Sequence, residues 1–174
     1  LENCRSSYRS AIKIALNKLP SRELIRVITS VVEEATCYGV LGINEVLTDT
    51  VDLYEVEAQE FLTKEEENID RLIETIRTAL KNNFSESQLN SLVEHLKQVV
   101  KNWEMVAQPI QLSAKSRGLD HEASKRVGGN IRSLAIAAFN DYNKLEISQQ
   151  LTALIQEIFA EVDKIAERAA EDAE

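Results

Sequence analysis

Glycine and proline, which punctuate β-rich proteins, are scarce in this sequence. Its 174 residues include five glycines, two prolines and 5% aromatic residues, whereas 44% are hydrophobic and 28% are charged. So few turn-forming residues favour long helices over short strands, and the chain is long enough to bury one sizeable core. The composition therefore predicts an all-α fold in which residues 1–174 form a single helical domain.

Long apolar runs and targeting signals are also missing. No apolar run approaches the roughly 18 residues that cross a bilayer, and the N-terminus lacks a basic segment followed by an apolar one. These absences predict a cytoplasmic protein that does not bind membranes. The chain starts at Leu1 without an initiator methionine, as a fragment or a processed chain would.

Cysteine and net positive charge are the remaining absences. Cys4 and Cys37 are too few for a disulfide framework or a four-ligand zinc site. The net charge of −9 argues against nucleic acid as a partner, because nucleic-acid binding usually leaves a basic footprint. The charge alternates along the chain: residues 1–26 and 71–132 are mainly basic, and residues 44–67 are acidic. Complementary helix faces or a docking surface would show this alternation, and so would solvated helix faces.

Residues 44–81 contain no glycine or proline and carry apolar residues every three or four positions. This spacing predicts one helix about 57 Å long. The apolar stripe along it shifts once, by one residue. A helix longer than a small domain is wide requires others along it, so the pattern predicts a helical bundle built on one long central helix. The stripe comprises Leu47, Val51, Tyr54, Ala58 and Phe61, then Leu62, Ile69, Ile73, Ile76 and Leu80.

Residues 1–43 are expected to form an N-terminal helical hairpin. Pro20 ends a first helix over about 4–19, and Ser21 is a natural N-cap for a second helix that ends near Tyr38. The second helix carries a broad apolar face of Leu24, Ile25, Ile28, Val31, Val32 and Ala35.

Residues 44–117 are expected to form a long antiparallel helix pair. Ser85 and Gln88 have the spacing of a capping box, with Phe84 and Leu89 placed as a hydrophobic staple, so the second helix of the pair should start at Ser85. Its packing face is Leu89, Leu92, Val93, Leu96, Val99, Val100, Trp103 and Val106.

Proline at position 109 removes a backbone donor and crowds the preceding turn. The helix is therefore expected to kink or break around Ala107 and Gln108 and to resume through Ile110, Leu112 and Ala114.

Residues 118–174 are expected to form a C-terminal helical hairpin. Gly118 suits a left-handed helix C-cap, and the next helix should run over about 121–141. Gly128 and Gly129 weaken that helix by about 1 kcal/mol each, and close approach of a neighbouring backbone would explain them. The hairpin resembles a tetratricopeptide unit, although no repeat at a fixed period is evident. Its apolar faces are Ile131, Leu134, Ala135, Ala138 and Phe139, then Leu151, Leu154, Ile155, Ile158, Phe159, Val162 and Ile165.

Candidate catalytic and metal-binding groups each have a simpler explanation. Neither His95 nor His121 follows a glutamate by three residues, which excludes a di-iron bundle motif. Asp120 is a helix cap, and neighbouring side chains at a helix start point in different directions, so residues 120–122 are not an acid–base cluster. The glutamates at 65–67 spread around a helix. We therefore predict no catalytic, cofactor-binding or metal-binding residue.

Basic residues gather around the predicted Gly118 turn. With the backbone donors of the following helix, they could bind an acidic peptide or a phosphate. Pairing with the chain's own acidic helices is the simpler explanation. The predicted anion- or partner-binding patch is Lys115, Arg117, His121, Lys125 and Arg126, with Arg132 nearby.

Three segments resemble the helical C-terminal region of bacterial J-domain-like, chaperone-associated proteins. They are VDLYEVEAQEFL at 51–62, QPIQLSAKSRGLDH at 108–121 and IRSLAI at 131–136, and the similarity covers about 51–165. A J domain needs a His-Pro-Asp tripeptide, which this sequence lacks. The resemblance thus implies a segment beside the chaperone-recruiting module, without chaperone stimulation of its own.

The sequence as a whole predicts a non-catalytic protein-interaction or scaffold module that needs no cofactor. Its partner would be a protein with an acidic surface, and the long helix offers a face for homo-oligomerisation. The alternative is an enzyme or small-molecule-binding domain with a pocket near Pro109, where Trp103, Tyr54 and the basic turn would converge. A dry apolar pocket with inward-facing ionisable groups would favour the alternative, and a flat or grooved surface with unmatched apolar residues would favour the module.

Overall fold

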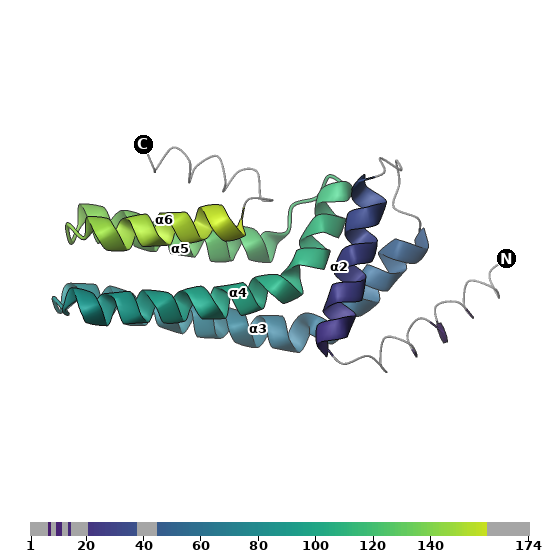
Figure 1. Ribbon diagram of the computed structural model, residues 1–174, viewed down its shortest axis with the longest axis horizontal. Coiled ribbons are helices and arrows are strands. Elements are labelled where there is room, and N and C mark those ends of the chain that lie inside the picture. The colour runs from purple at the N-terminus through teal and green to yellow at the C-terminus, as the bar shows by residue number, and fades with distance from the viewer. Residues whose placement is uncertain (1–6, 8–9, 12–13, 15–20, 38–44, 160–174) are drawn as a thin grey trace. The chain divides into compact units, whose positions relative to one another are not determined.

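The computed structural model is built from helices (Figure 1). It describes residues 7, 10, 11, 14, 21–37 and 45–159. These residues include no strand, so the all-α prediction is confirmed. The predicted helix over 4–19 lies outside the described residues apart from four positions. The helices are α2 (Ser21–Cys37), α3 (Glu45–Lys81), α4 (Glu86–Ser116), α5 (Glu122–Asn140) and α6 (Leu145–Ile158).

Packing divides the chain into two compact units. Unit 1 comprises Leu1–Glu60 and Met105–His121, and unit 2 comprises Phe61–Glu104 and Glu122–Glu174. Helices α3 and α4 therefore contribute residues to both units. Three statements stay predictions. They are the single domain with divisions at 43 and 117, the central position of the long helix, and the tetratricopeptide-like character of the C-terminal hairpin.

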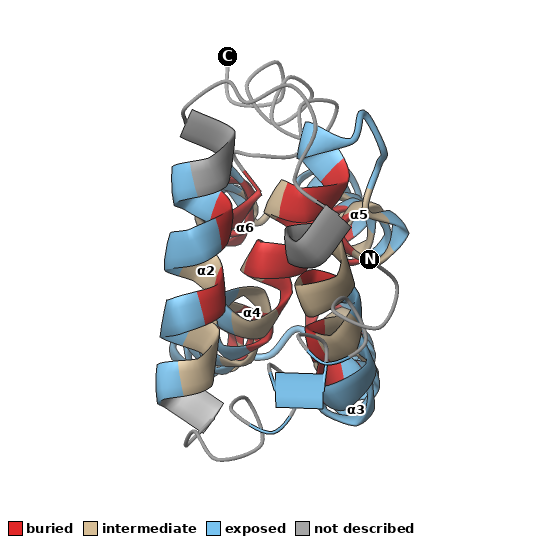
Figure 2. Ribbon diagram, turned by 90° about the vertical axis from the view of Figure 1, so that its right-hand side faces the viewer, coloured by how far each residue is buried: buried red, intermediate tan, exposed pale blue. Residues whose placement is uncertain are grey.

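The described core of unit 1 comes from α2, the first part of α3 and the last part of α4. Helix α2 carries its buried residues along one side, and the opposite side is exposed (Figure 2). Val31, which the pattern assigns to the apolar face, is 43% exposed, so the buried stripe is narrower than predicted. The core residues are Ile28, Val32, Val51, Tyr54, Ala58, Ala107, Ile110 and Ala114.

The predicted start of α4 is confirmed by its capping box. The Ser85 N–H donates to Gln88 Oε1 at 3.1 Å, and the Gln88 N–H donates to Ser85 Oγ at 3.4 Å. Each side chain thus satisfies a backbone donor that the helix leaves without a partner. Leu89 is fully buried, and Phe84 is 42% exposed.

A kink or a break is predicted around Ala107 and Gln108. Helix α4 continues through Pro109 to Ser116, so the break does not occur, and the kink stays a prediction. Ala107 and Ile110, on either side of the proline, are almost completely buried. Burial on both sides holds the backbone helical although the proline removes a hydrogen bond. Tertiary packing here outweighs a local preference.

Left-handed residues end α3 and α4 as glycine-type caps. Gly118 has φ +70°, its N–H donates to Lys115 O at 2.9 Å, and the Leu119 N–H donates to Ala114 O at 2.9 Å. This is the Schellman pattern, and it confirms the predicted cap. Asn83, with φ 53°, ends α3 in the same way.

Unit 2 contains two helical hairpins that run in the same direction (Figure 1). The end of α3 and the start of α4 form the first, and α5 and α6 form the second. Their buried residues correspond at a constant spacing of 58 positions, a regularity that the sequence analysis missed. The pairs are Ile69 and Val127, Ile73 and Ile131, Ile76 and Leu134, Leu80 and Ala138, Leu89 and Ile147, Val93 and Leu151, Leu96 and Leu154, and Val100 and Ile158.

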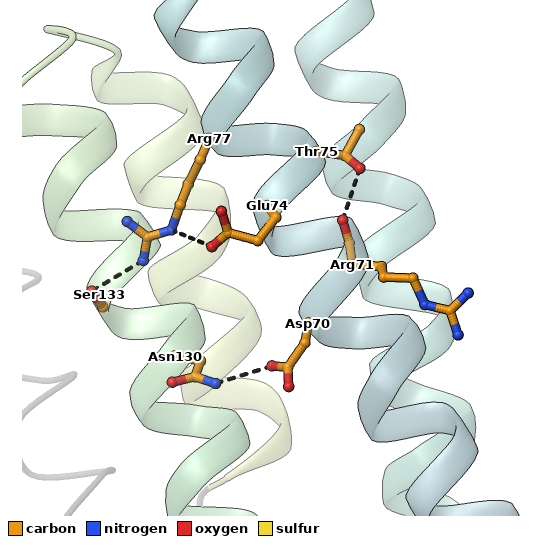
Figure 3. A network of polar contacts seen from close by, with 7 residues as sticks. All are labelled: Asp70, Arg71, Glu74, Thr75, Arg77, Asn130 and Ser133. Carbon is orange, nitrogen blue, oxygen red and sulfur yellow. Dashed lines mark hydrogen bonds and ion pairs between the residues drawn. The ribbon is translucent and has the colours of Figure 1, made fainter.

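Polar side chains join α3 to α5 (Figure 3). Asn130 Nδ2 donates to Asp70 Oδ1 at 3.0 Å, and Arg77 Nη2 donates to Ser133 Oγ at 3.2 Å while its Nε lies 3.4 Å from Glu74. The contact that lies later in α3 also lies later in α5, so the two helices run parallel.

A second set of polar contacts joins α4 to α6. Gln150 Nε2 donates to Asn90 Oδ1 at 3.1 Å. Glu157 lies 2.6 Å from Lys101 Nζ and 3.9 Å from Lys97 Nζ. The hydrogen bond from Lys101 and the charge of both lysines lower the pKa of Glu157.

Three predictions for unit 2 are wrong in detail. Phe61 is 41% exposed and Phe139 is 48% exposed, although both were assigned to packed faces. A methyl group at Gly129 would meet no heavy atom within 4 Å, so close backbone approach does not explain this glycine. Each of these positions lies at the edge of an apolar stripe, where sequence spacing alone does not decide whether a neighbouring helix covers the residue.

Candidate functional site

Unit 1 carries an open groove between α2 and the part of α4 that precedes Pro109. Its volume is about 610 Å³. This is the range of ligand sites, about 300–1,000 Å³, although the groove is open to solvent. The lining residues are Glu23, Ile25, Arg26, Thr29, Ser30 and Glu33 from α2, with Met105 and Gln108 from α4.

The α2 wall follows from the placement of its buried stripe. Because Ile28 and Val32 face the core, the neighbouring Ile25 and Thr29 are left half-buried and form the inner part of the wall. Thr29 Oγ1 donates to Ile25 O at 2.9 Å, so its hydroxyl donor is used within α2. This part of the wall therefore offers mainly apolar contact.

The α4 wall depends on the proline. Met105 is 49% exposed and stands four residues before Pro109, so its carbonyl has no helical N–H partner. Next to it, Tyr54 Oη donates to Val106 O at 2.9 Å. Burial raises the pKa of Tyr54, which keeps the phenol protonated and able to donate. The flexible thioether side chain of Met105 thus stands next to a stretch of α4 backbone that the Tyr54 hydrogen bond supports.

Exposed charged residues surround the groove. Glu23 lies in the first turn of α2, where the helix dipole stabilises a carboxylate. Glu33 and Glu34 lie near the opposite end, where the dipole is negative, and the last turn of α2 contains no basic residue. Among the described residues that line the groove, Arg26 is the only cation.

The predicted basic patch is divided between the two units. Lys115 and Arg117 are exposed in unit 1, and His121 is half-buried there. Arg117 Nη1 lies 3.8 Å from Asp52 Oδ1, and Arg117 Nε donates to Ser113 O at 3.2 Å. This arginine thus ties the end of α4 to α3.

The other two patch residues lie in unit 2 and also have acidic partners. Lys125 Nζ lies 3.3 Å from Glu122 Oε1, and Arg126 pairs with Glu66 of α3. Arg117, Lys125 and Arg126 therefore each pair with a carboxylate of their own chain. Anion binding by the patch stays a prediction, with the intramolecular explanation favoured.

Two of the residues assigned to the pocket of the alternative interpretation do not line the α2/α4 groove, and that pocket stays a prediction. Trp103 is fully buried in unit 2, with its ring centroid 6.3 Å from that of Phe159. Tyr54 is buried in unit 1 and bonded to the backbone. Neither lines the groove, although the groove does lie beside Pro109.

Sequence reasoning missed the groove because both walls look ordinary in the sequence. The available signal was a row of polar residues on α2, namely Glu23, Arg26, Ser30 and Glu33, spaced by three and four positions. The exposed methionine just before the proline was the second signal. Joining them required knowing that α2 and α4 lie together.

Comparisons with protein-family models, curated proteins and solved structures found no match for this chain. Within the described residues, no helix is long and apolar enough to cross a membrane. The same residues contain no group of three or more histidine, cysteine, aspartate or glutamate side chains placed to hold a metal ion.

Proposed function

We propose that this chain is a non-catalytic protein-interaction module and that its partner binds in the α2/α4 groove. The observation that carries the proposal is the open groove itself, which combines the exposed Met105 with a charged rim. An apolar centre with a polar edge is the usual anatomy of a protein interface. Methionine suits such a surface because its side chain adapts to different partners.

The ionisable lining residues support binding over catalysis. Glu23, Arg26 and Glu33 are all exposed. Catalytic acids and bases usually lie in clefts that exclude water, whereas these side chains face solvent. Exposed side chains on the rim instead set the orientation and association rate of a partner.

The wider setting is part of the same proposal. The J-domain-like resemblance of 51–165 suggests a chaperone-associated scaffold, with α3 as its central helix. The α5–α6 hairpin would be the tetratricopeptide-like unit, and the 58-residue correspondence supports its origin as one of two related hairpins. The basic patch remains a second candidate surface, for an acidic partner, and it is weakened by the pairing of Arg117 with Asp52.

A photo-crosslinking experiment tests the groove. p-Benzoylphenylalanine replaces Ser30 in the groove or, as the control, Gln98 on the exposed side of α4 in unit 2. We expect a discrete protein adduct only from position 30, lost in Met105→Glu and kept in Arg117→Ala. Circular dichroism melts verify that both variants fold.

The opposite results are equally informative. No adduct at position 30 above the position 98 background would show that the groove is not a docking site. An adduct lost in Arg117→Ala and kept in Met105→Glu would move the interaction to the basic patch.

A further inference from the structure

We propose that two copies of this chain form a symmetric dimer through the side of the first hairpin of unit 2 that faces away from the second hairpin. This side is the outer face, and its residues are Asn68, Leu72, Thr75, Leu92 and Val99. The outer face is a different surface from the α2/α4 groove of unit 1, so the dimer goes beyond the proposed function and does not depend on it.

The two hairpins of unit 2 are related by a shift, because α3 runs parallel to α5 and α4 runs parallel to α6. The polar contacts between them join residues that are 56 or 60 positions apart, on either side of the 58-residue correspondence. A shift brings two unlike sides into contact, as every head-to-tail arrangement does. The side that the second hairpin uses therefore exists on the first hairpin as well, where neither α5 nor α6 covers it.

The correspondence between the hairpins identifies the residues of that side. The second hairpin contacts the first through Arg126, Asn130, Ser133, Gln150 and Glu157. Their counterparts, 58 positions earlier, are Asn68, Leu72, Thr75, Leu92 and Val99. Equivalent residues of equivalent hairpins point in the same direction, so these counterparts face away from the second hairpin.

Apolar side chains stand at the centre of the outer face. Leu72, Leu92 and Val99 are half-buried, and they take the places of an asparagine, a glutamine and a glutamate in the second hairpin. The last hairpin of a stack normally has a polar outer side, because that side faces water. An apolar side at this position instead indicates a surface that another protein surface covers.

The polar residues of the outer face already donate hydrogen bonds within α3. Asn68 Nδ2 donates to Glu65 Oε1 at 3.3 Å, and Thr75 Oγ1 donates to Arg71 O at 2.7 Å. Covering a polar group costs less free energy when its donor has a partner in the protein. The outer face can therefore lose water without leaving these donors unsatisfied.

The turn end of the first hairpin adds exposed apolar surface. Phe84 is 42% exposed and, with Thr75 and Ala79, lines a depression of about 310 Å³. An apolar ring beside a depression provides both a projection and a recess for a partner surface. Burial of such apolar surface favours association by about 25 cal/mol per Å².

The absence of charge selects a second copy as the partner. None of the five outer-face residues is charged, whereas the second hairpin uses Arg126 and Glu157 at the corresponding positions. A twofold axis brings identical surfaces together, so a charged face would place like charges opposite one another, and an apolar face matches itself. A strongly charged partner would gain no ion pair at this face.

The size of the outer face sets the expected strength of the dimer. Its residues extend over about four turns on each of two neighbouring helices, which places it at the small end of specific interfaces. We therefore expect a dissociation constant in the micromolar range.

Sedimentation velocity of the full chain over about 1–300 µM tests the dimer. We expect dimers to increase with concentration, and the dissociation constant to rise at least about tenfold in Leu92→Lys and in Thr75→Lys, because each buries a lysine against its symmetry copy. The matched control is Gln149→Lys, which adds the same charge at an exposed residue of α6 and should change the constant less than about twofold.

Salt provides an independent measurement on the unmodified protein. Each copy carries a net charge of −9, so the two copies repel one another at long range. Raising the salt from about 0.1 M to about 1 M shortens the Debye length from about 10 Å to about 3 Å and screens this repulsion. A dimer held by an uncharged face should therefore keep or gain affinity at high salt.

Circular dichroism melts verify that the three lysine variants fold. Thr75 is exposed in the single chain, so Thr75→Lys tests the outer face even where Leu92→Lys lowers stability.

Four other outcomes overturn the inference. A chain that stays monomeric up to the highest concentration has no dimer of this kind. A dimer that both outer-face variants leave intact, or that Gln149→Lys weakens equally, uses another surface. A dimer that dissociates as salt is raised is held by charge. A dimer that Met105→Ser disrupts and Leu92→Lys preserves forms through the α2/α4 groove.

Discussion

Tyr54 illustrates how one buried hydroxyl supports the backbone beside the groove. Its Oη donates to the Val106 carbonyl at 2.9 Å across 52 residues of sequence. Tyr54→Phe removes this part-buried hydrogen bond and leaves the Val106 carbonyl without the phenol donor, so we expect the free energy of unfolding to fall by about 1–2 kcal/mol. Urea denaturation followed by circular dichroism measures it. Tyr142→Phe, the same change at a half-buried residue of the α5–α6 turn, should cost less.

The same residue makes stability depend on alkaline pH. Burial raises the pKa of Tyr54 above its ordinary value of 10.0. Below pH 10 the phenol is protonated in both the folded and the unfolded chain, so its contribution is fully present. Above pH 10 the unfolded phenol loses its proton while the folded one keeps it, and stability falls. Between pH 9 and 11 the unfolding free energy of Tyr54→Phe should decline less steeply than that of the unmodified protein, and parallel curves would rule out this contribution.

Helix α5 contains a glycine, Gly129, at a position where a larger side chain would fit. Gly129 is exposed in the helix interior, and a methyl group there would meet no heavy atom within 4 Å. Alanine reduces the freedom of the unfolded chain and favours helix, so Gly129→Ala should raise the free energy of unfolding by about 1 kcal/mol. Chemical denaturation of both proteins checks this.

The matching substitution at the end of α4 should act in the opposite direction. Gly118 also has open space around it, but its φ is +70°. A left-handed conformation costs a side-chain-bearing residue about 1–2 kcal/mol, so Gly118→Ala should destabilise the protein by about that much. Equal effects at both positions would mean that backbone conformation is not what separates them.

At the scale of the whole molecule, stability comes from apolar stripes that bury against one another. In unit 2 the stripes recur in two hairpins with buried residues 58 positions apart. Because each helix has an apolar face to bury, we expect the chain to fold without metal or cofactor. Helical circular dichroism at 222 nm should be unchanged by a chelator, and a loss of signal that zinc or calcium restores would contradict this expectation.

Composition and local sequence patterns determined the fold class and most helix boundaries of this protein. The start of α4 was set by Ser85 and Gln88, and the end by Gly118, because capping uses hydrogen bonds within a few residues. The buried positions at the centres of the apolar stripes, such as Ile76 and Leu96, followed from their spacing along the helix.

Only tertiary structure decided what happens where two helices meet. Whether α4 breaks at Pro109 depended on burial around it and on packing that its own sequence does not contain. The pairing of Arg117 with Asp52, the exposure of Phe139 and the groove between α2 and α4 likewise bring together residues far apart in the chain or at the edge of a stripe. Spacing along a helix fixes the direction of each side chain around that helix, but the identity of its neighbour is a property of the assembled fold.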